Sequence, residues 1–532
     1  MRSPSVLVLE MAASGRGSGW YDRHVKLPNF SGVMAQVVAV WCRELGASVS
    51  YRTFTGNEPL DRLLVGQWDI VFISAYTQTA WAAYAIGRHC SRRGAVTVLG
   101  GPHAQAWPDD ARRFFDYVVG NADRNLVGRI MDERQRARDA GGERVSAPKP
   151  PRSLPGLRQR APFLALAVRK AHLVHSIPVL GSIGCPYACE FCSDASVAFQ
   201  PLSPEGIEDD VRFALEAFPR AVLFWHDPSF GVRFDDVLDA IERGLAGRRI
   251  RFGAEAPLAL LAPARIARLA RAGFVALLPG IEGWLRADPK LGHGRLTGWD
   301  KLRETAGQVE ELLQAVPYVQ ANFIFGLEDE TEEAYELTRA FVDRLPGAWP
   351  NYNLMTAYGE SSPLGSRLQR EDRVLPVPFP LLDQKHCPNV VLPAPSLRRL
   401  FPSLCRLVEH SSGRRMAIRR ARAGKGWTVR LINLLRARGR EQRCRLAWYR
   451  AMGEWLARDR EFCRFFEGER VPVPVQLREA ALRRLGPFRA LLTQGELTDL
   501  LRGPAPPGRA DALGGRTPRP FADPAYTSDV TH

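Results

Sequence analysis

The chain has 532 residues, of which 45% are hydrophobic and 24% are charged, so a fibrous or wholly disordered protein is excluded. This length predicts three or four domains. The longest strongly apolar runs, such as Ala161 to Val168, are far shorter than the roughly 20 residues that cross a bilayer. Because the N-terminus also lacks the apolar core of a signal peptide, we expect a cytoplasmic protein without transmembrane helices.

Residues 1–135 alternate short β-rich runs with stretches of helical periodicity. This alternation predicts a doubly wound, Rossmann-like α/β domain that binds a ligand at the carboxyl ends of its strands. Residues 136–165 are rich in Gly, Pro, Ser and Arg and are interpreted as a linker. The predicted strands are Val6 to Leu9, Asp69 to Ser74, Ala95 to Leu99 and Tyr117 to Val119.

In residues 166–370 the alternation starts again, and six strands with intervening helices predict a partial (β/α)6 TIM-like barrel. Residues 371–502 are interpreted as a mostly helical, basic domain, and residues 503–532 as a disordered tail. The predicted barrel strands are Pro178 to Ile183, Ala221 to Trp225, Ile250 to Gly253, Phe274 to Leu278, Val319 to Phe325 and Tyr352 to Thr356.

The net charge of +16 is concentrated near the C-terminus. Between Ser411 and Arg450, thirteen Lys or Arg residues accompany a single acidic residue, Glu441. Apolar residues interleave with them at helical spacing, which predicts a pair of amphipathic basic helices. An acidic peptide leader, a phosphorylated substrate, nucleic acid and an anionic membrane surface remain open as partners, and a solvated protein face is the alternative.

Cys185, Cys189 and Cys192 lie within eight residues, directly after the first predicted barrel strand. The thiolates of such a triplet suit one face of an iron–sulfur cluster, and zinc is the alternative metal. A closed zinc site requires a fourth ligand, whereas three cysteines on a four-iron cluster leave one iron open. The other six cysteines are scattered, and we interpret them as ordinary thiols rather than as a disulfide framework.

The motif Cys-x3-Cys-x-Phe-Cys at this position resembles that of the radical S-adenosylmethionine enzymes. The resemblance implies that the three cysteines hold a [4Fe-4S] cluster, that S-adenosylmethionine binds the fourth iron, and that Phe191 lies against the adenine. Glu282 in Gly-Ile-Glu and Gly326 after the fifth strand match further cofactor-binding positions of the family. Glu328 and Asp329 replace the usual Pro-Gly that follows Gly326 and Leu327, so the adenine contact differs there.

After the second barrel strand, Trp225 to Gly231 read Trp-His-Asp-Pro-Ser-Phe-Gly, which resembles the cobalamin-dependent branch of that family. The resemblance implies that Asp227 binds the amino group of S-adenosylmethionine or acts in catalysis, and a helix-capping role is the alternative. Glu255 and Tyr358 follow the third and sixth strands. We expect them at the same edge of the barrel as acid–base groups or substrate contacts.

Two turns of the first domain, at the ends of neighbouring predicted strands, resemble the cobalamin-binding turns of that branch. The resemblance implies a base-off cobalamin, because Asp22-Arg-His24-Val-Lys-Leu27 matches the histidine-ligand motif only in part. A degenerate domain without cobalamin is the alternative. The expected cobalamin-binding residues are Ser74, Thr77, Gly100, Gly101, Pro102 and His103.

Together these features predict a cobalamin-dependent radical S-adenosylmethionine methyltransferase that moves a methyl group from methylcobalamin to an unactivated carbon or a phosphorus. Its substrate would be a small molecule or a peptide, and the basic region suits an anionic one. Its reductant would be a flavodoxin or a ferredoxin. One alternative is a radical cyclase or oxidoreductase that transfers no methyl group. Another is a nucleic-acid-binding or RNA-modifying protein, which we do not favour because the sequence has no aromatic-rich RNA-recognition motif.

Overall fold

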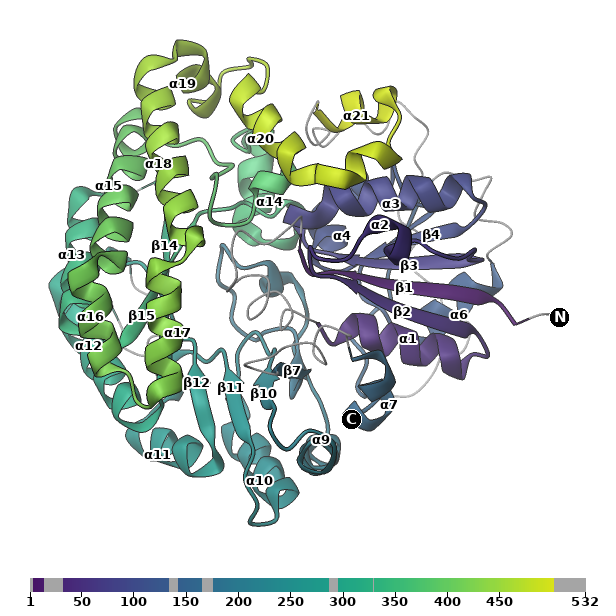
Figure 1. The fold of residues 1–532 in the computed structure, drawn as a ribbon, viewed down its shortest axis with the longest axis horizontal. Coiled ribbons are helices and arrows are strands. Elements are labelled where there is room, and N and C mark those ends of the chain that lie inside the picture. The colour runs from purple at the N-terminus through teal and green to yellow at the C-terminus, as the bar shows by residue number, and fades with distance from the viewer. Residues whose placement is uncertain are drawn as a thin grey trace, which may run out of the picture.

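The computed structural model describes residues 3–13, 32–133, 142–164, 176–286, 295–328 and 330–501. These residues form two parallel sheets and a helical C-terminal region (Figure 1). The fold is therefore α/β, as the sequence predicts. The predicted tail lies outside the described residues. Within the described ranges, none of the helices combines the length and the apolar character of a membrane span.

The first sheet has the strand order β2-β1-β3-β4-β5-β6, and all of its neighbouring strands are parallel. Both faces of the sheet are apolar. Successive side chains of β1 point to opposite faces, so that Leu7 and Leu9 pack on one side and Val6 and Val8 on the other. Helix α3 (Ala80–Arg92) covers the first side, and α1 (Met34–Glu44) and α6 (Arg124–Asp132) cover the second (Figure 1). The strands are β1 (Ser5–Met11), β2 (Ser48–Phe54), β3 (Ile70–Ala75), β4 (Val96–Gly100), β5 (Tyr117–Val119) and β6 (Glu143–Val145).

Two strands of this sheet were not predicted. The edge strand β2 is mostly half-buried and carries polar residues at alternate positions, so its sequence lacks a strong apolar signal. Strand β6 falls inside the segment 136–165 that the sequence assigns to a linker, and it pairs with β5. Only three residues of β6 join the sheet, and only Val145 among them is buried.

The second sheet is an open barrel of parallel strands in the order β7-β10-β11-β12-β14-β15, with β13 paired beside β14. Helices α9 to α13 pack on its outer side (Figure 1). Its strands are β7 (Ser176–Val179), β10 (Val222–Trp225), β11 (Arg251–Ala254), β12 (Phe274–Leu277), β13 (Gly280–Glu282), β14 (Tyr318–Phe325) and β15 (Ala348–Leu354). Its helices are α9 (Pro204–Ala217), α10 (Phe234–Leu245), α11 (Pro263–Ala272), α12 (Gly298–Ala315) and α13 (Glu332–Arg344).

The C-terminal helices first pack on the barrel and then return to the first domain (Figure 1). Helices α15 and α18 pack together beside α13, and Phe488 meets Phe54 of β2 at a ring-centroid distance of 4.8 Å. Three short helices, α2 (Leu60–Leu63), α4 (Pro102–Ala106) and α5 (Pro108–Ala111), belong to the first domain. The C-terminal helices are α14 (Pro363–Arg370), α15 (Ala394–Ser412), α16 (Arg414–Ala423), α17 (Trp427–Arg438), α18 (Arg440–Arg458), α19 (Arg460–Phe466), α20 (Val475–Leu485) and α21 (Gln494–Leu501).

Arg160 joins the first domain to the barrel. It ends the short helix α7 (Leu157–Arg160), and its side chain is 2% exposed. The guanidinium donates to Gln36 Oε1 of α1 at 3.0 Å and to the carbonyl of Pro178 in β7 at 3.2 Å. It also pairs with Asp210 of α9 at 3.4 Å, which supplies the opposite charge that a buried cation requires.

Candidate functional site

Tyr76 directly follows β3, at the carboxyl edge of the first sheet. Burial raises the pKa of Tyr76 above its ordinary value, and the charges of Glu10, Glu255 and Asp194 raise it further. Glu10 belongs to β1, Glu255 follows β11 of the barrel, and Asp194 lies two residues after Cys192. One phenol is thus within electrostatic reach of both sheets and of the cysteine segment.

The three cysteines lie on a tight loop after β7. A short antiparallel pair, β8 (Ser182–Ile183) with β9 (Gln200–Pro201), closes its base. Gly184 permits the turn: its φ is +69°, and a Cβ atom there would approach the carbonyl oxygens of residues 197 and 198 to 2.5 Å. Cys185 is buried, whereas Cys189, Cys192 and Phe191 are half-buried. The thiols are therefore held in one loop that is only partly covered.

The loop after β10 holds the start of this cysteine segment. The buried carboxylate of Asp227 accepts hydrogen bonds from Gly181 N at 2.9 Å and from Ser182 Oγ at 2.6 Å. Burial raises the pKa of Asp227 to about 6, and these hydrogen bonds oppose the shift. The geometry thus makes Asp227 a positioning residue for the cysteine loop.

Ser229 of the same loop was missed by the sequence analysis. Its hydroxyl is buried and lies 3.2 Å from Cys185 Sγ. The motif Trp-His-Asp-Pro-Ser-Phe-Gly contained the residue, but only the folded chain brings it to the thiol. A hydroxyl at this distance can donate a hydrogen bond to a cysteine thiolate and stabilise its charge.

The donor set fits an iron–sulfur cluster. All nine cysteines of the chain are free thiols, and the three of the loop are soft ligands that suit iron with sulfide. Across the residues that the structure describes, no group of three or more His, Cys, Asp or Glu side chains is arranged to hold a single metal ion. In a cubane cluster each cysteine binds a different iron, so the three sulfur atoms need not converge on one point.

The strand ends that follow in the barrel carry Glu282 and Gly326, both with left-handed backbone conformations. Glu282 has a φ of +61°, and its carboxylate bends back over Gly280, where a Cβ atom would lie 2.2 Å from it. Such a conformation is strained for a residue other than glycine and is found preferentially at functional sites. Gly326 has a φ of +87°, which glycine adopts without strain.

Glu330 stabilises the turn after β14. Its buried carboxylate accepts hydrogen bonds from the backbone N–H groups of Gly326 and Leu327, the latter at 3.2 Å. Burial raises the pKa of Glu330 to about 7. Glu328, which departs from the family pattern, pairs instead with Arg373, and Asp329 lies outside the described residues.

Glu255 and Tyr358 have different environments. Glu255 is exposed at the end of β11, within electrostatic reach of Tyr76. Tyr358 is half-buried and forms side-chain hydrogen bonds with Gln384 and Thr356, and burial raises its pKa. The charge of Glu255 therefore reaches the first sheet, while the Tyr358 hydroxyl is held by Thr356 of the barrel and Gln384 of the C-terminal region.

In the first domain, the turns after β3 and β4 touch each other. Gly101 has a φ of +89°, and a Cβ atom there would lie 3.0 Å from Ala75 N and from Ser74 Oγ. A Cβ atom on the neighbouring Gly100 would meet nothing within 4 Å. Gly101 thus packs its backbone against the end of β3, while Gly100 leaves space beside the carboxyl edge of the sheet, where ligands of such sheets bind.

The side chains of Thr77 and His103, predicted as cobalamin contacts, point into the protein. His103 is fully buried, and its ring nitrogens lie 2.6 Å from Tyr84 Oη and 3.4 Å from Thr77 Oγ1. Burial lowers the pKa of His103 to about 3, so the ring is neutral. Ser74 is half-buried and Pro102 exposed. His24, the histidine of the partial ligand motif, lies outside the described residues.

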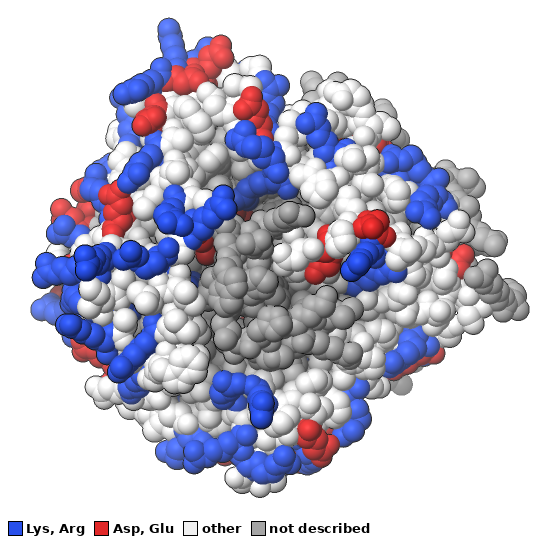
Figure 2. Space-filling model, viewed as in Figure 1, with Lys and Arg blue, Asp and Glu red and all other residues white. Residues whose placement is uncertain are grey.

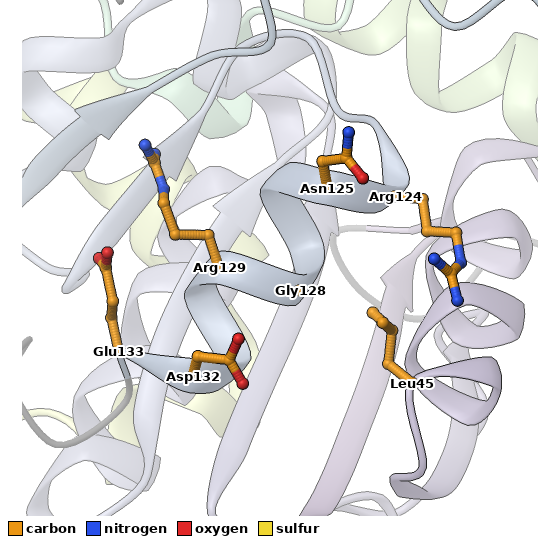
Figure 3. Close-up of a pocket in the computed structure, with 7 residues that line it drawn as sticks. All are labelled: Leu45, Arg124, Asn125, Gly128, Arg129, Asp132 and Glu133. Carbon is orange, nitrogen blue, oxygen red and sulfur yellow. The ribbon is translucent and has the colours of Figure 1, made fainter. Parts of the chain in front are cut away.

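A separate hollow of about 390 Å³ lies on the outer side of the first domain, over α6 and the end of α1 (Figure 3). Arg129 and Glu133 extend on one side of it and Arg124 on the other, and Gly128 leaves the space above Leu45 open (Figure 3). We assign no chemistry to it, because it is remote from the strand ends. The lining residues are Leu45, Arg124, Asn125, Gly128, Arg129, Asp132 and Glu133.

The chain resembles several known proteins in sequence and in fold. No family model matches the chain. The bacteriochlorophyllide d C-12(1)-methyltransferase of Chlorobaculum tepidum is 24% identical over 300 residues, which cover 55% of this chain and 64% of that enzyme. The hopanoid C-2 methylase of Rhodopseudomonas palustris is 25% identical and covers 58% of each chain. The chain thus spans less than two thirds of the length of these relatives.

Two solved structures share the fold. One is TsrM from Kitasatospora setae, a radical S-adenosylmethionine methyltransferase with cobalamin and a [4Fe-4S] cluster bound. It has a TM-score of 0.51 and 15% identity, over 70% of this chain and 75% of TsrM. The other, OxsB, a cobalamin-dependent S-adenosylmethionine radical enzyme, has a TM-score of 0.52 and 13% identity, over 94% and 80% of the two chains. The chain thus shares its fold with cobalamin-dependent radical S-adenosylmethionine enzymes and resembles in sequence methyltransferases of bacteriochlorophyllide d and hopanoids.

Proposed function

We propose that the protein is a cobalamin-dependent radical S-adenosylmethionine methyltransferase. It would transfer a methyl group to an unactivated carbon, or to a phosphorus, of a small molecule or peptide. The observation that carries the proposal is the cysteine loop after β7, whose start is held by hydrogen bonds from Gly181 and Ser182 to Asp227 and whose Cys185 Sγ lies 3.2 Å from Ser229 Oγ. The charges of Glu255 and Asp194 reach Tyr76 beside the cobalamin-type turns, which supports placing both cofactors near one another, and the named activities of the curated relatives favour methyl transfer.

The cofactors of this proposal are a [4Fe-4S] cluster on Cys185, Cys189 and Cys192, S-adenosylmethionine, and a base-off cobalamin. When bound, they supply the radical chemistry and the methyl transfer, and the protein supplies position and exclusion of water. Asp227 and Ser229 hold the cysteine loop in place. We keep Phe191, Glu282 and Gly326 as proposed S-adenosylmethionine contacts, and Ser74, Gly100, Gly101 and Pro102 as proposed cobalamin contacts.

Glu255 is the proposed acid–base group or substrate contact, because its carboxylate is exposed at the end of β11 and its charge reaches Tyr76. For Asp227, Tyr358, Thr77 and His103 we propose positioning roles, since their polar atoms are engaged inside the protein. A flavodoxin or ferredoxin is the proposed reductant. The cytoplasm is the proposed compartment, because it keeps thiols reduced.

The test begins with anaerobic reconstitution of the wild type, Cys189→Ala and Cys444→Ala, the last an exposed cysteine of α18. Each protein receives iron, sulfide and hydroxocobalamin, and is desalted before metals and cobalamin are counted. We expect about four irons and one cobalamin in the wild type and in Cys444→Ala, and a strong loss of iron in Cys189→Ala. A wild type that retains no iron would contradict the proposal.

The methyl transfer itself is tested with S-adenosylmethionine that carries a deuterated methyl group. The reconstituted enzyme is incubated with a chemical reductant and a small-molecule extract of its own cells. A product that carries the label supports a methyltransferase. Cleavage of S-adenosylmethionine with an unlabelled product would instead indicate a radical cyclase or oxidoreductase.

A further inference from the structure

The outer surface of α16 and α17 carries apolar side chains that face solvent. Trp427 is 72% exposed, Leu434 42% and Leu431 36%, and Ile418 of α16 is 41% exposed. At 100° per residue, the three residues of α17 lie within a sector of about 60° on one side of the helix. They form a continuous apolar stripe, which we call the α17 stripe.

Basic residues surround the α17 stripe. Glu441, the single acidic residue between positions 411 and 450, is half-buried and pairs with Arg445 at 3.0 Å. Figure 2 shows Lys and Arg side chains dense over the C-terminal helices, at the left of the view, with white surface among them. The exposed basic residues between positions 411 and 450 are Arg414, Arg415, Arg422, Lys425, Arg430, Arg438, Arg440, Arg443 and Arg450.

This charge pattern differs from the outer face of the barrel helices, where arginines pair with neighbouring carboxylates. Arg268 of α11, for example, contacts Asp235 at 3.1 Å and Glu242 at 2.7 Å. Such pairing cancels charge at a solvated face. The excess positive charge around the α17 stripe is therefore a local feature of these helices and leaves a field that attracts anions.

Packing on the barrel fixes the orientation of the α17 stripe. Asn433 and Ala437, about 130° and 90° around α17 from the centre of the stripe, are buried. Arg436 of α17 and Arg420 of α16 lie over the Trp349 ring of β15, at 4.3 and 4.9 Å from its centroid. Because these contacts hold the inner side, the Trp427, Leu431 and Leu434 side chains stay on the outer side.

We propose that this surface docks on an anionic membrane. An apolar helical stripe bordered by Lys and Arg is the arrangement of helices that lie in the plane of a bilayer surface. Three of the four exposed apolar residues are aliphatic, which suits acyl chains better than stacked nucleobases. The positive border complements anionic headgroups. This proposal is independent of the cofactors and of the reaction.

The experiment is co-sedimentation of the full chain with sucrose-loaded vesicles of phosphatidylcholine alone, or with 30% phosphatidylglycerol. The variants are the triple substitution Trp427→Ala, Leu431→Ala, Leu434→Ala, the single Trp427→Ala, and the charge reversal Arg414→Glu, Arg415→Glu. The matched control is Trp299→Ala. Trp299 is 53% exposed at the start of α12. The residue of α12 that Lys425 contacts is Gln314, and the helix rise places Trp299 about 22 Å from it.

We expect the wild type and Trp299→Ala to bind the anionic vesicles, with binding weakened at least tenfold in the triple variant and severalfold in each of the other two. Neutral vesicles should bind at least tenfold more weakly than anionic ones. Circular dichroism checks that each variant is folded. Failure of the wild type to bind, or equal binding by all variants, would overturn the proposal. So would binding to a generic RNA that displaces the vesicles and is unaffected by Trp427→Ala.

Discussion

The Ser229 hydroxyl lies 3.2 Å from Cys185 Sγ, while two residues earlier Asp227 binds the backbone and side chain at the start of the cysteine segment. One loop after β10 thus organises the segment that follows β7. These two strands are neighbours in the sheet, and their registered ends bring the two loops together.

This contact leads to a prediction for Ser229→Ala. The variant should still bind iron, because its three cysteines are unchanged. It should cleave S-adenosylmethionine about tenfold more slowly, because an outer hydrogen bond to a ligating sulfur is lost. Its cluster should also have a more negative reduction potential, since hydrogen bonds to sulfur stabilise the reduced state. Ser196→Ala, an exposed serine of the same segment, is the control and should match the wild type.

Gly100 and Gly101 should respond differently to substitution by alanine. Gly101→Ala places a Cβ at φ +89° and ψ −176°, a conformation essentially restricted to glycine, and should lower the free energy of unfolding of the cofactor-free protein by about 1–3 kcal/mol. Gly100→Ala meets open space and should leave that stability unchanged, yet weaken cobalamin binding at least tenfold. Thermal unfolding and equilibrium dialysis measure the two effects. Unchanged cobalamin affinity in Gly100→Ala would remove this residue from the proposed cobalamin site.

Glu330 predicts a pH dependence of stability. Burial raises its pKa from 4.5 to about 7, so the folded protein binds this proton more tightly than the unfolded chain does. The stabilisation is complete below pH 4.5 and is lost as the pH rises through 7, a change of up to about 3 kcal/mol.

The measurement is thermal unfolding of the cofactor-free protein between pH 5 and 7.5, for the wild type and for Glu330→Gln. The variant has no proton to lose at this position, so its stability should fall less as the pH rises. Glu333→Gln, on an exposed residue of α13, is the matched control and should keep the wild-type slope. Identical slopes in the wild type and Glu330→Gln would contradict the assignment.

Arg160→Met should destabilise the junction between the first domain and the barrel. The substitution leaves Asp210 without the buried partner that now lies at 3.4 Å, and it removes the hydrogen bond to Gln36. We expect a loss of about 3–5 kcal/mol in the free energy of unfolding, measured in urea. The control is Arg158→Met. The Arg158 side chain is 70% exposed and pairs with Glu216, so its loss should change the free energy of unfolding by less than about 0.5 kcal/mol.

The sequence by itself determined both α/β domains and the cysteine loop. Four strands of the first sheet and all six strands predicted for the barrel are present, because buried parallel strands are continuous apolar runs that stand out between helices. Strands β2 and β6 escaped prediction because an edge strand and a three-residue strand bury few apolar residues. Their place depends on pairing with β1 and β5 rather than on their own composition.

Only the tertiary structure decided what the polar residues contact. Sequence reasoning placed Asp227 and His103 in cofactor sites, but the fold buries both side chains in internal hydrogen bonds. It also brought the Ser229 hydroxyl to the Cys185 thiol, a contact that the motif containing Ser229 did not reveal. The physical reason is that a strand pattern fixes which residues are buried, whereas hydrogen bonds and charge interactions depend on distances between strand ends far apart in the chain.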